Sequence, residues 1–290
     1  MKKLLILLAL VTLIGAAAAG CGNKDAENGD AQSAGDTSLT DITTKGELIL
    51  GCDDSFPPMG FRDQNGEVVG FDIDLAQGVA DKLGVDLVVK PINWSTKEMD
   101  LLNGNIDVIW NGYTITQERD LAVEFSKPYL NNEQVFVVRA NSDINSVADF
   151  AGKLIGCQID SAALSAINAD PALLGIIEDL TVYDNYQDAL LDLRISDRIS
   201  VVAVDKVLIN YEMTQLPGEY RVLDDVLAVE YYGIGMRKGS AALSQAIDDA
   251  LDEMQDDGTT DVISSKWFGE NIVIRDVEKL TQDELLEIEG

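Results

Sequence analysis

The stretch Ile109–Arg119 reads Ile-Trp-Asn-Gly-Tyr-Thr-Ile-Thr-Gln-Glu-Arg, and it predicts a strand, a loop and the start of a helix. The apolar run that ends at Trp110 is typical of a buried strand, Asn-Gly indicates a turn, and Thr116 is a good helix N-cap. In open α/β sheets, ligands bind at such a junction, at the carboxyl end of a strand. Loop N–H groups, a threonine hydroxyl and the Arg119 guanidinium would together form a receptor for a carboxylate. A surface ion pair between Arg119 and Asp120 explains the spacing at least as well.

Strand and helix patterns alternate on both sides of this stretch and predict an α/β fold. Before it we expect strands at 47–52 and 86–90, a hairpin that turns at Asn65-Gly66, a helix capped by Asp72, and a helix at 97–102. After it, a long strand at 134–139 leads into a second alternating series at 146–213, and a strand at 229–236 leads back to helices at 240–256 and 261–268. Such successions imply mainly parallel sheets with helices on both faces.

Three segments, in order and in spacing, resemble the polar amino acid family of solute-binding proteins that serve ABC importers. They are Val69–Ala76, Gly112–Arg119 and Phe125–Tyr129, and the similarity extends from Gly46 to Phe268. The resemblance implies a two-lobe periplasmic-binding-protein type II fold, in which each lobe is a mainly parallel sheet flanked by helices and two crossover strands form the hinge. Periodicity alone would also allow two independent domains in series.

The resemblance divides the chain into segments. We expect a signal peptide at 1–20, a lipidated cysteine and disordered tether at 21–40, lobe 1 at 41–136 and 232–275, lobe 2 at 137–231, and an acidic tail at 276–290. To the tail we assign no role beyond a frayed or peripheral helix.

The composition excludes several classes of function. Among 290 residues, Lys and Arg total 21, Asp and Glu total 51, histidine is absent, and the formal net charge is −30. Such a surface repels nucleic acid and anionic lipid. The lack of histidine excludes a Ser-His-Asp triad and imidazole metal ligands, and no EF-hand loop is found. We therefore expect no nucleic-acid partner, no metal and no cofactor.

The amino-terminal segment predicts export. Two lysines after Met1 precede the apolar run Leu4–Ala19 of 16 residues and a small-residue processing site, a pattern typical of a signal peptide and short for a membrane span. Cys21 directly after Ala-Ala-Gly resembles a bacterial lipoprotein box, which implies an extracytoplasmic protein anchored to the cell membrane by lipid. A cleaved peptide with an unmodified Cys21 would instead give a freely soluble secreted protein.

A zwitterionic ligand requires a fixed cation and a fixed anion, because a lone buried charge is expensive. Arg119 is the candidate cation. Asp205 is the candidate anion, since it follows the apolar run Val201–Val204 in the second lobe and matches the family aspartate that binds the ligand's ammonium group. Asp205 has an alternative role as the N-cap of a helix that begins at Lys206, and the two roles are compatible.

The resemblance implies further ligand contacts. They are Asp53, Phe56, Trp94, Gly112, Thr114, Gln158, Ser161 and Ala162. Phe56 and Trp94 would clamp the ligand side chain, and Gln158 would read its distal polar end. Asp53 would contact either the ligand's amino group or a distal side-chain group, and N–H groups at Ser161 and Ala162 would hold its carboxylate. Core packing is the alternative for the aromatic residues, and a turn is the alternative for Asp53.

An acid and two cysteines are also expected near the cleft. The resemblance places Asp160 where relatives have glycine. It would bring a negative charge close to the ligand's carboxylate unless its side chain points outward or meets a cationic ligand side chain. Cys52 and Cys157 would lie in opposite lobes. We expect two buried free thiols there, although an extracytoplasmic setting permits a disulfide.

The sequence thus predicts a monomeric, lipid-anchored protein that binds a polar L-amino acid and delivers it to ABC permease subunits, without catalysis. Glutamine-like, cystine-like and cationic amino acids all fit. The alternative is an enzyme of the same fold, a dehydratase acting on a small cyclic carboxylic acid, with Asp53, Asp160 or Asp205 as general acid.

Overall fold

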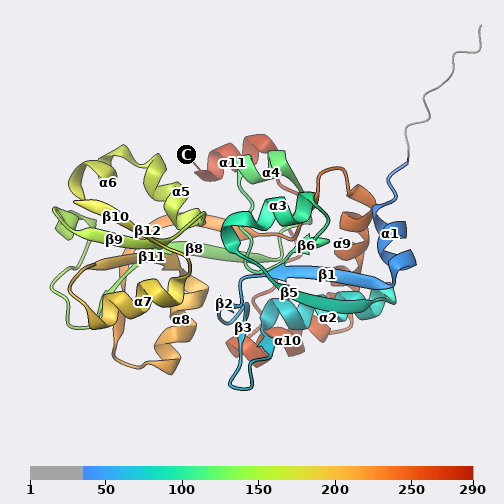
Figure 1. The fold of residues 1–290 in the computed structure, drawn as a ribbon, viewed down its shortest axis with the longest axis horizontal. Helices are drawn as coiled ribbons and strands as arrows, with labels where there is room; N and C mark the ends of the chain where they lie inside the picture. The colour runs from blue at the N-terminus through green and yellow to red at the C-terminus, as the bar shows by residue number, and fades with distance from the viewer. Residues whose placement is uncertain (1–34, 290) are drawn as a thin grey trace, which may run out of the picture. The chain divides into compact units, whose positions relative to one another are not determined.

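A five-stranded sheet forms the core of the first lobe in residues 35–289, the part of the chain that the computed structural model describes (Figure 1). Its strand order is β5 (Asp86–Pro91), β1 (Glu47–Cys52), β6 (Val108–Ile109), β13 (Gly235–Arg237) and β7 (Val123–Phe125). β1 is parallel to β5 and β6, whereas β13 is antiparallel to β6 and β7. The predicted hairpin is confirmed within a small antiparallel sheet of β2 (Ser55–Phe56), β3 (Gly60–Arg62) and β4 (Val68–Val69).

A second five-stranded sheet forms the core of the other lobe. Its strand order is β10 (Asp179–Tyr183), β9 (Leu154–Gln158), β11 (Val201–Asp205), β8 (Leu130–Arg139) and β12 (Tyr220–Tyr232). β9 is parallel to β10 and β11, and β8 is antiparallel to both of its neighbours. The predicted α/β class with two lobes is therefore confirmed.

Helices cover both faces of the sheets, as the alternating pattern predicts. In the first lobe they are α1 (Ser38–Lys45), α2 (Phe71–Leu83), the 3-10 turn η1 (Trp94–Thr96), α3 (Lys97–Leu102), α4 (Gln117–Ala122), α9 (Ala241–Asp256) and α10 (Thr259–Phe268). In the second they are the 3-10 turn η2 (Val147–Phe150), α5 (Ala162–Ala169), α6 (Pro171–Ile176), α7 (Tyr186–Ile195) and α8 (Lys206–Gln215). Figure 1 shows α2 and α10 on one side of β1 and β5 and α3 on the other.

β8 and β12 carry the chain between the lobes and form the two-stranded hinge. They pair antiparallel from Leu130 opposite Tyr232 to Arg139 opposite Tyr220, with shifts of register near Val226. The prediction of a single returning strand at 229–236 is wrong. β12 ends at Tyr232 and β13 begins at Gly235, and a Cβ at the intervening Gly233 would lie 2.8 Å from the Ile115 side chain. The chain passes too close to this side chain for a larger residue.

The role predicted for Asp72 is wrong. The N-cap of α2 is Gly70, and Asp72 lies inside the helix, where its side chain is fully buried. Its carboxylate accepts hydrogen bonds from the Gly112 N–H at 2.8 Å and from the Tyr129 hydroxyl at 2.9 Å. Asp72 therefore joins α2 to the loop that precedes α4.

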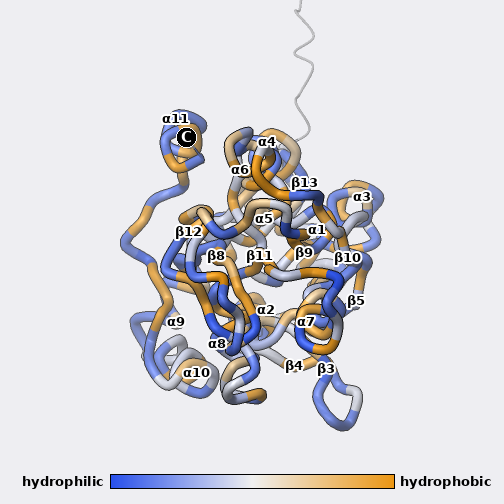
Figure 2. The backbone as a smooth tube through the Cα atoms, turned by 90° about the vertical axis from the view of Figure 1, so that its left-hand side faces the viewer, coloured by the Kyte–Doolittle hydropathy of each residue, from blue (hydrophilic) through white to orange (hydrophobic). Residues whose placement is uncertain are grey.

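Both ends of the described chain are more ordered than the sequence suggested. α1 begins at Ser38, inside the segment expected to be a tether, and the Ser38 hydroxyl accepts a hydrogen bond from the Leu243 N–H of α9 at 3.1 Å. The acidic tail forms α11 (Gln282–Glu289), whose Leu285 is buried in an apolar cluster of the first lobe. Figure 2 shows hydrophobic and hydrophilic residues alternating along α11, as this one-sided burial requires. The tail is thus a packed helix rather than a frayed one.

The predicted signal peptide and Cys21 lie outside the described residues. Within residues 35–289, the structure contains no helix that is both long enough and apolar enough to span a membrane.

Candidate functional site

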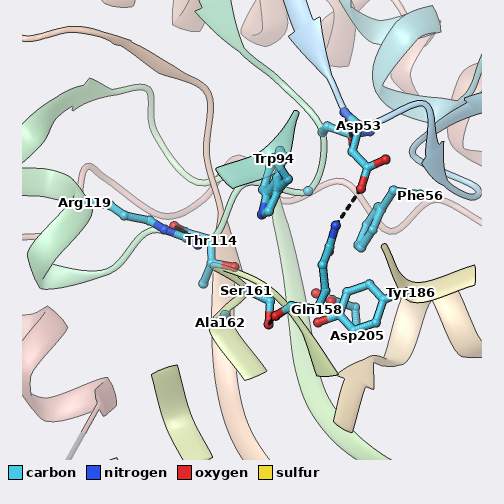
Figure 3. A pocket seen from close by; sticks show the side chains of 12 residues that line it. Asp53, Phe56, Trp94, Thr114, Arg119, Gln158, Ser161, Ala162, Tyr186 and Asp205 are labelled. Atoms are coloured by element: carbon cyan, nitrogen blue, oxygen red, sulfur yellow. Dashed lines mark hydrogen bonds between the residues drawn. The ribbon is translucent and has the colours of Figure 1, made fainter. Parts of the chain in front are cut away.

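All ten residues singled out as ligand contacts line one narrow cavity between the lobes (Figure 3). The first lobe contributes Asp53, Phe56, Trp94, Gly112, Thr114 and Arg119, and the second contributes Gln158, Ser161, Ala162 and Asp205. Asn111 and Tyr186 complete the lining, and the sequence analysis missed both. Asn111 was detectable in principle because it stands directly before Gly112, whereas nothing around Tyr186 distinguished it from a core residue.

Buried polar contacts fix the loop between β6 and α4. Gly112 has a φ of +58°, and a Cβ there would lie 2.9 Å from the Phe56 ring, so the position requires glycine. Asn111 accepts a hydrogen bond from the Asp53 N–H at 3.0 Å. Asp72 anchors the Gly112 N–H, and burial raises the pKa of this carboxyl group to about 7. These contacts fix the loop that presents Thr114 and Arg119 to the cavity.

Arg119 is oriented by the start of α4. The Thr116 hydroxyl accepts a hydrogen bond from the Arg119 N–H at 3.1 Å, which confirms the predicted N-cap. The Arg119 guanidinium lies over the Tyr113 ring, 4.7 Å from its centroid. Its Nη1 donates to the Thr114 carbonyl at 3.1 Å and its Nη2 donates to the Asp160 carbonyl at 2.9 Å.

The alternative ion pair between Arg119 and Asp120 is not formed. The Asp120 carboxylate accepts a hydrogen bond from the Gln282 amide of α11, and both recorded acceptors of the guanidinium are neutral carbonyl oxygens. A carboxylate would bind these donors more strongly than a carbonyl does, because both partners would then be charged.

Asp205 is the last residue of β11, and its side chain is 4% exposed. Its Oδ1 atom accepts three hydrogen bonds, from the Asn132 amide at 3.0 Å, the Gln134 amide at 2.7 Å and the Tyr232 hydroxyl at 2.5 Å. Asp205 occupies the N-cap position of α8, but its side chain makes no capping hydrogen bond, so the alternative role is not adopted. Since all recorded donors bind Oδ1, the oxygen left for an incoming donor is Oδ2.

A polar pair and an aromatic wall lie between the two charged ends. The Gln158 amide donates to the Asp53 carboxylate at 2.7 Å, which joins the two lobes (Figure 3). Burial raises the pKa of Asp53, and hydrogen bonds from Ser55 and Gln158 oppose that shift. The Phe56 and Tyr186 rings lie 6.0 Å apart between centroids. This part of the cavity therefore combines apolar surface with one acidic group.

Of the alternatives for Asp160, the structure shows a side chain that points away from the cavity and binds a cation. Asp160 has a φ of +58°, in the left-handed region that glycine reaches most easily. This backbone turns its side chain to Lys97, whose Nζ lies 2.6 Å from Asp160 Oδ2. The Lys97 side chain is 1% exposed, and its ammonium group also lies 4.9 Å from the Trp94 ring centroid. The charge of Asp160 is thus neutralised by a lysine that the sequence analysis placed only on a helix.

Ser161 caps α5, because its hydroxyl accepts a hydrogen bond from the Leu164 N–H at 3.1 Å. Ala162 therefore stands at the first position of the helix, where backbone N–H groups lack helical partners and favour an anion. Cys52 and Cys157 are both free and buried, as expected, and burial raises the pKa of each thiol to about 12. Thiols with such pKa values remain protonated and unreactive at neutral pH.

Among residues 35–289, no group of three or more His, Cys, Asp or Glu side chains is arranged to hold a metal ion. The site instead places a guanidinium and a carboxylate at opposite ends of an aromatic cavity. It can hold a small dipolar molecule by pairing both of that molecule's charges at once.

Comparisons with known proteins show the family of the chain. The chain is 30% identical over 236 residues to the L-cystine-binding protein TcyJ of Escherichia coli (strain K12), and the match covers 81% of this chain and 87% of that protein. A crystal structure of an ABC uptake transporter substrate-binding protein from Streptococcus pneumoniae, with bound histidine, matches with a TM-score of 0.80 and 36% identity, covering 83% of this chain and 99% of that one. An ancestral arginine-binding protein bound to glutamine matches with a TM-score of 0.72 and 39% identity, covering 78% and 99%. Residues 48–270 match the bacterial extracellular solute-binding proteins, family 3, and this chain therefore belongs to that family.

Proposed function

We propose that this chain is the extracytoplasmic substrate-binding component of an ABC importer, and that it binds a polar L-amino acid between its lobes. One observation carries the proposal: Arg119 of the first lobe and Asp205 of the second line the same cavity. An α-amino acid carries a carboxylate and an ammonium group on adjacent atoms, so it can pair with both residues at once. The L-cystine-binding relative and the similar structures with bound histidine or glutamine support the same class of ligand.

The ligand's carboxylate would bind the Arg119 guanidinium in place of carbonyl oxygens, close to the first N–H groups of α5. Its ammonium group would donate to Asp205 Oδ2 and to oxygen atoms of the Gly112–Thr114 loop. Because each lobe supplies only one of the two charges, the closed arrangement of the lobes binds the ligand more tightly than an open one. Ligand binding then shifts the population toward closure, and the closed form is the one delivered to the permease.

The charges in the cavity restrict the ligand's side chain. Two carboxylates, those of Asp53 and Asp205, line the cavity, but only one cation of the described chain, Arg119, does. An acidic side chain would meet Asp53 at close range, whereas an amide, imidazole, amine or guanidinium group would donate to it. Phe56, Trp94 and Tyr186 supply apolar faces for the rest of the side chain. We therefore propose a neutral amide-bearing or cationic amino acid rather than aspartate or glutamate.

The dehydratase alternative receives no support from these relatives, which are binding proteins. Of its three candidate general acids, Asp160 is paired with Lys97 at 2.6 Å. Asp205 accepts three hydrogen bonds on one oxygen, and these oppose the rise in its pKa that burial causes.

The lipid anchor at Cys21, the permease partners and the monomeric state belong to the proposal as well. The family's description as extracellular supports an extracytoplasmic location. Metabolic labelling with a palmitate analogue tests the anchor. Labelled wild-type chain, with no label in Cys21→Ala, is the expected result, and release of unlabelled wild-type protein into the medium would contradict it.

Calorimetry with the twenty amino acids and cystine tests the binding function. We expect one or a few polar amino acids to bind, and Arg119→Ala to abolish their binding. Arg198→Ala provides the matched control, because Arg198 is an exposed arginine of the second lobe that pairs with Asp192 outside the cavity. Retained affinity in Arg119→Ala, or an equal loss in both variants, would refute the proposed site.

A further inference from the structure

Glu230 of β12 is a second buried acid beside Asp205, and it does not line the cavity that Arg119 and Asp205 share. Its side chain is 4% exposed. β8 lies between β11 and β12, and its register places Gln134 opposite Asp205 and Asn132 opposite Glu230. Asp205 and Glu230 therefore flank the same short segment of the hinge.

The same two amide groups hold both carboxyl groups. Asn132 Nδ2 donates to Asp205 Oδ1 at 3.0 Å and to Glu230 Oε1 at 2.5 Å. Gln134 Nε2 donates to these two oxygens at 2.7 Å and 2.8 Å. Two carboxyl oxygens that share both donors must lie close together. Within the described residues, Glu230 Oε2 is buried without a hydrogen-bond partner.

Two negative charges are unfavourable in such a place. Both groups are removed from water, and the recorded donors near them are neutral amides and a tyrosine hydroxyl. Burial and the adjacent charge of Asp205 raise the pKa of Glu230 to about 8, and burial raises the pKa of Asp205. A pair of this kind holds one proton between its members at neutral pH.

We propose that Glu230 is a positioning residue for ligand binding, which shares one proton with Asp205 and releases it when the ligand's ammonium group binds. The inference rests on the proposed amino-acid function. With the proton on Glu230, the pair carries a single negative charge, matched to a single ammonium group. Arrival of that positive charge favours ionisation of the second carboxyl group, and the proton passes to the solvent.

Few positive charges of residues 35–289 lie near the pair, so little in its surroundings would lower its pKa and drive the proton off. Tyr186 of α7 and Tyr232 of β12 face the pair, and burial keeps the pKa of each hydroxyl well above its usual value. On β8 and α8, Glu133 and Lys206 pair with each other at 2.6 Å. Glu230 also lines a groove next to α4, α5 and α11. Besides Glu230, the charged residues of this groove are one cation, Arg119, and five acids, Glu98, Glu118, Asp160, Asp170 and Glu289.

The direction of the pH dependence follows from linkage. The free pair binds its proton more tightly than the ligand-bound pair does, so ligand affinity rises as pH increases toward the pKa of the free pair and levels off above it. We expect a several-fold gain in affinity between about pH 6 and about pH 8, and less than the limit of tenfold per pH unit that one released proton sets.

Calorimetry with L-glutamine, L-histidine, L-arginine and L-cystine as probes tests the inference in buffers of different ionisation enthalpy. The wild-type chain should release a fraction of a proton per ligand bound. Glu230→Gln replaces the protonated acid by an amide of the same shape, so it should keep its affinity near pH 6 within about threefold and release no proton. Glu133→Gln removes a neighbouring, partly exposed acid that pairs with Lys206, and it should behave like the wild type. Equal proton release in the wild type and Glu230→Gln, or none in the wild type, would overturn the inference.

Infrared spectroscopy separates this inference from the proposed function, because it needs no ligand. The free wild-type chain at neutral pH should show a carboxylic acid carbonyl band that titrates near pH 8 and is missing from Glu230→Gln. A wild-type chain without that band would refute the shared proton even if amino acids bind. If no probe binds, the proposed function fails, and the infrared result still decides the protonation of the pair.

Discussion

The cationic and anionic ends of the cleft are built in different ways. Arg119 is half-buried on a helix of six residues, and its guanidinium donates to two neutral carbonyl groups, one of them in the opposite lobe. Asp205 is buried at the end of a central strand and accepts three hydrogen bonds from the hinge. The anionic end is therefore assembled before the ligand arrives, whereas the cationic end gains a charged partner only from the ligand. Binding and stability should respond differently to changes at the two ends.

Removing the cation should have the largest effect on binding. Arg119→Ala takes away a pair of charge-assisted hydrogen bonds, so we expect an affinity loss of more than about 100-fold, since each such bond contributes about 1.5–3 kcal/mol. The free energy of unfolding should change by less than about 0.5 kcal/mol, because the helix is short and the side chain is partly exposed. Calorimetry and urea unfolding measure the two quantities. A large loss of stability would contradict the contrast between the two ends.

Removing the anion should reduce both binding and stability. Asp205→Ala removes the acceptor that Asn132, Gln134 and Tyr232 share, and it leaves the buried Tyr232 hydroxyl without a partner, because the two amides still donate to Glu230. We expect the free energy of unfolding to fall by about 1–3 kcal/mol. Asp205→Asn keeps an acceptor oxygen and should retain most of the stability while losing most of the affinity. Equal stability of the alanine and asparagine variants would show that the hinge network is not preorganised by Asp205.

Breaking the pair between Lys97 and Asp160 tests closure separately from ligand contact. Asp160→Ala leaves a buried ammonium group without its partner in the other lobe, and we expect about tenfold weaker ligand binding, equivalent to about 1.4 kcal/mol. The double variant Lys97→Met and Asp160→Ala should recover part of this loss, because the buried ammonium group that lost its partner in the other lobe is removed as well. A double-mutant cycle without coupling would show that the pair makes no contribution to closure.

Changing Asp53 should alter selectivity more than affinity. Asp53→Asn keeps an oxygen acceptor for a neutral amide ligand but removes the charge that attracts a cationic one. We expect the ratio of affinities for arginine and glutamine to fall roughly tenfold, the effect of losing one charge-assisted contact. Competition calorimetry on the two proteins measures this ratio, and an unchanged ratio would remove Asp53 from the determinants of selectivity.

Much of the fold was accessible from the sequence, because local signals decided it. The strand at Glu47–Cys52 and the helix at Lys97–Leu102 have the predicted bounds, and Thr116 caps its helix as its position suggested. Each of these depends on hydrophobic periodicity or on a cap within a few residues. The errors occurred where distant residues compete with such signals. Asp72 looks like an N-cap, yet its carboxylate binds the N–H of a residue 40 positions away.

The sequence by itself determined the two-lobe fold, through three ordered motifs, and the identity of the charges at each end of the cleft. Only the tertiary structure decided which partner each charge has. Asp160 binds Lys97 across the cleft. Glu230 and Asp205 accept hydrogen bonds from the same two side-chain amides of the intervening strand. The physical reason is that the free energy of a buried charge depends on the groups that replace its water, and folding brings those groups from remote parts of the chain.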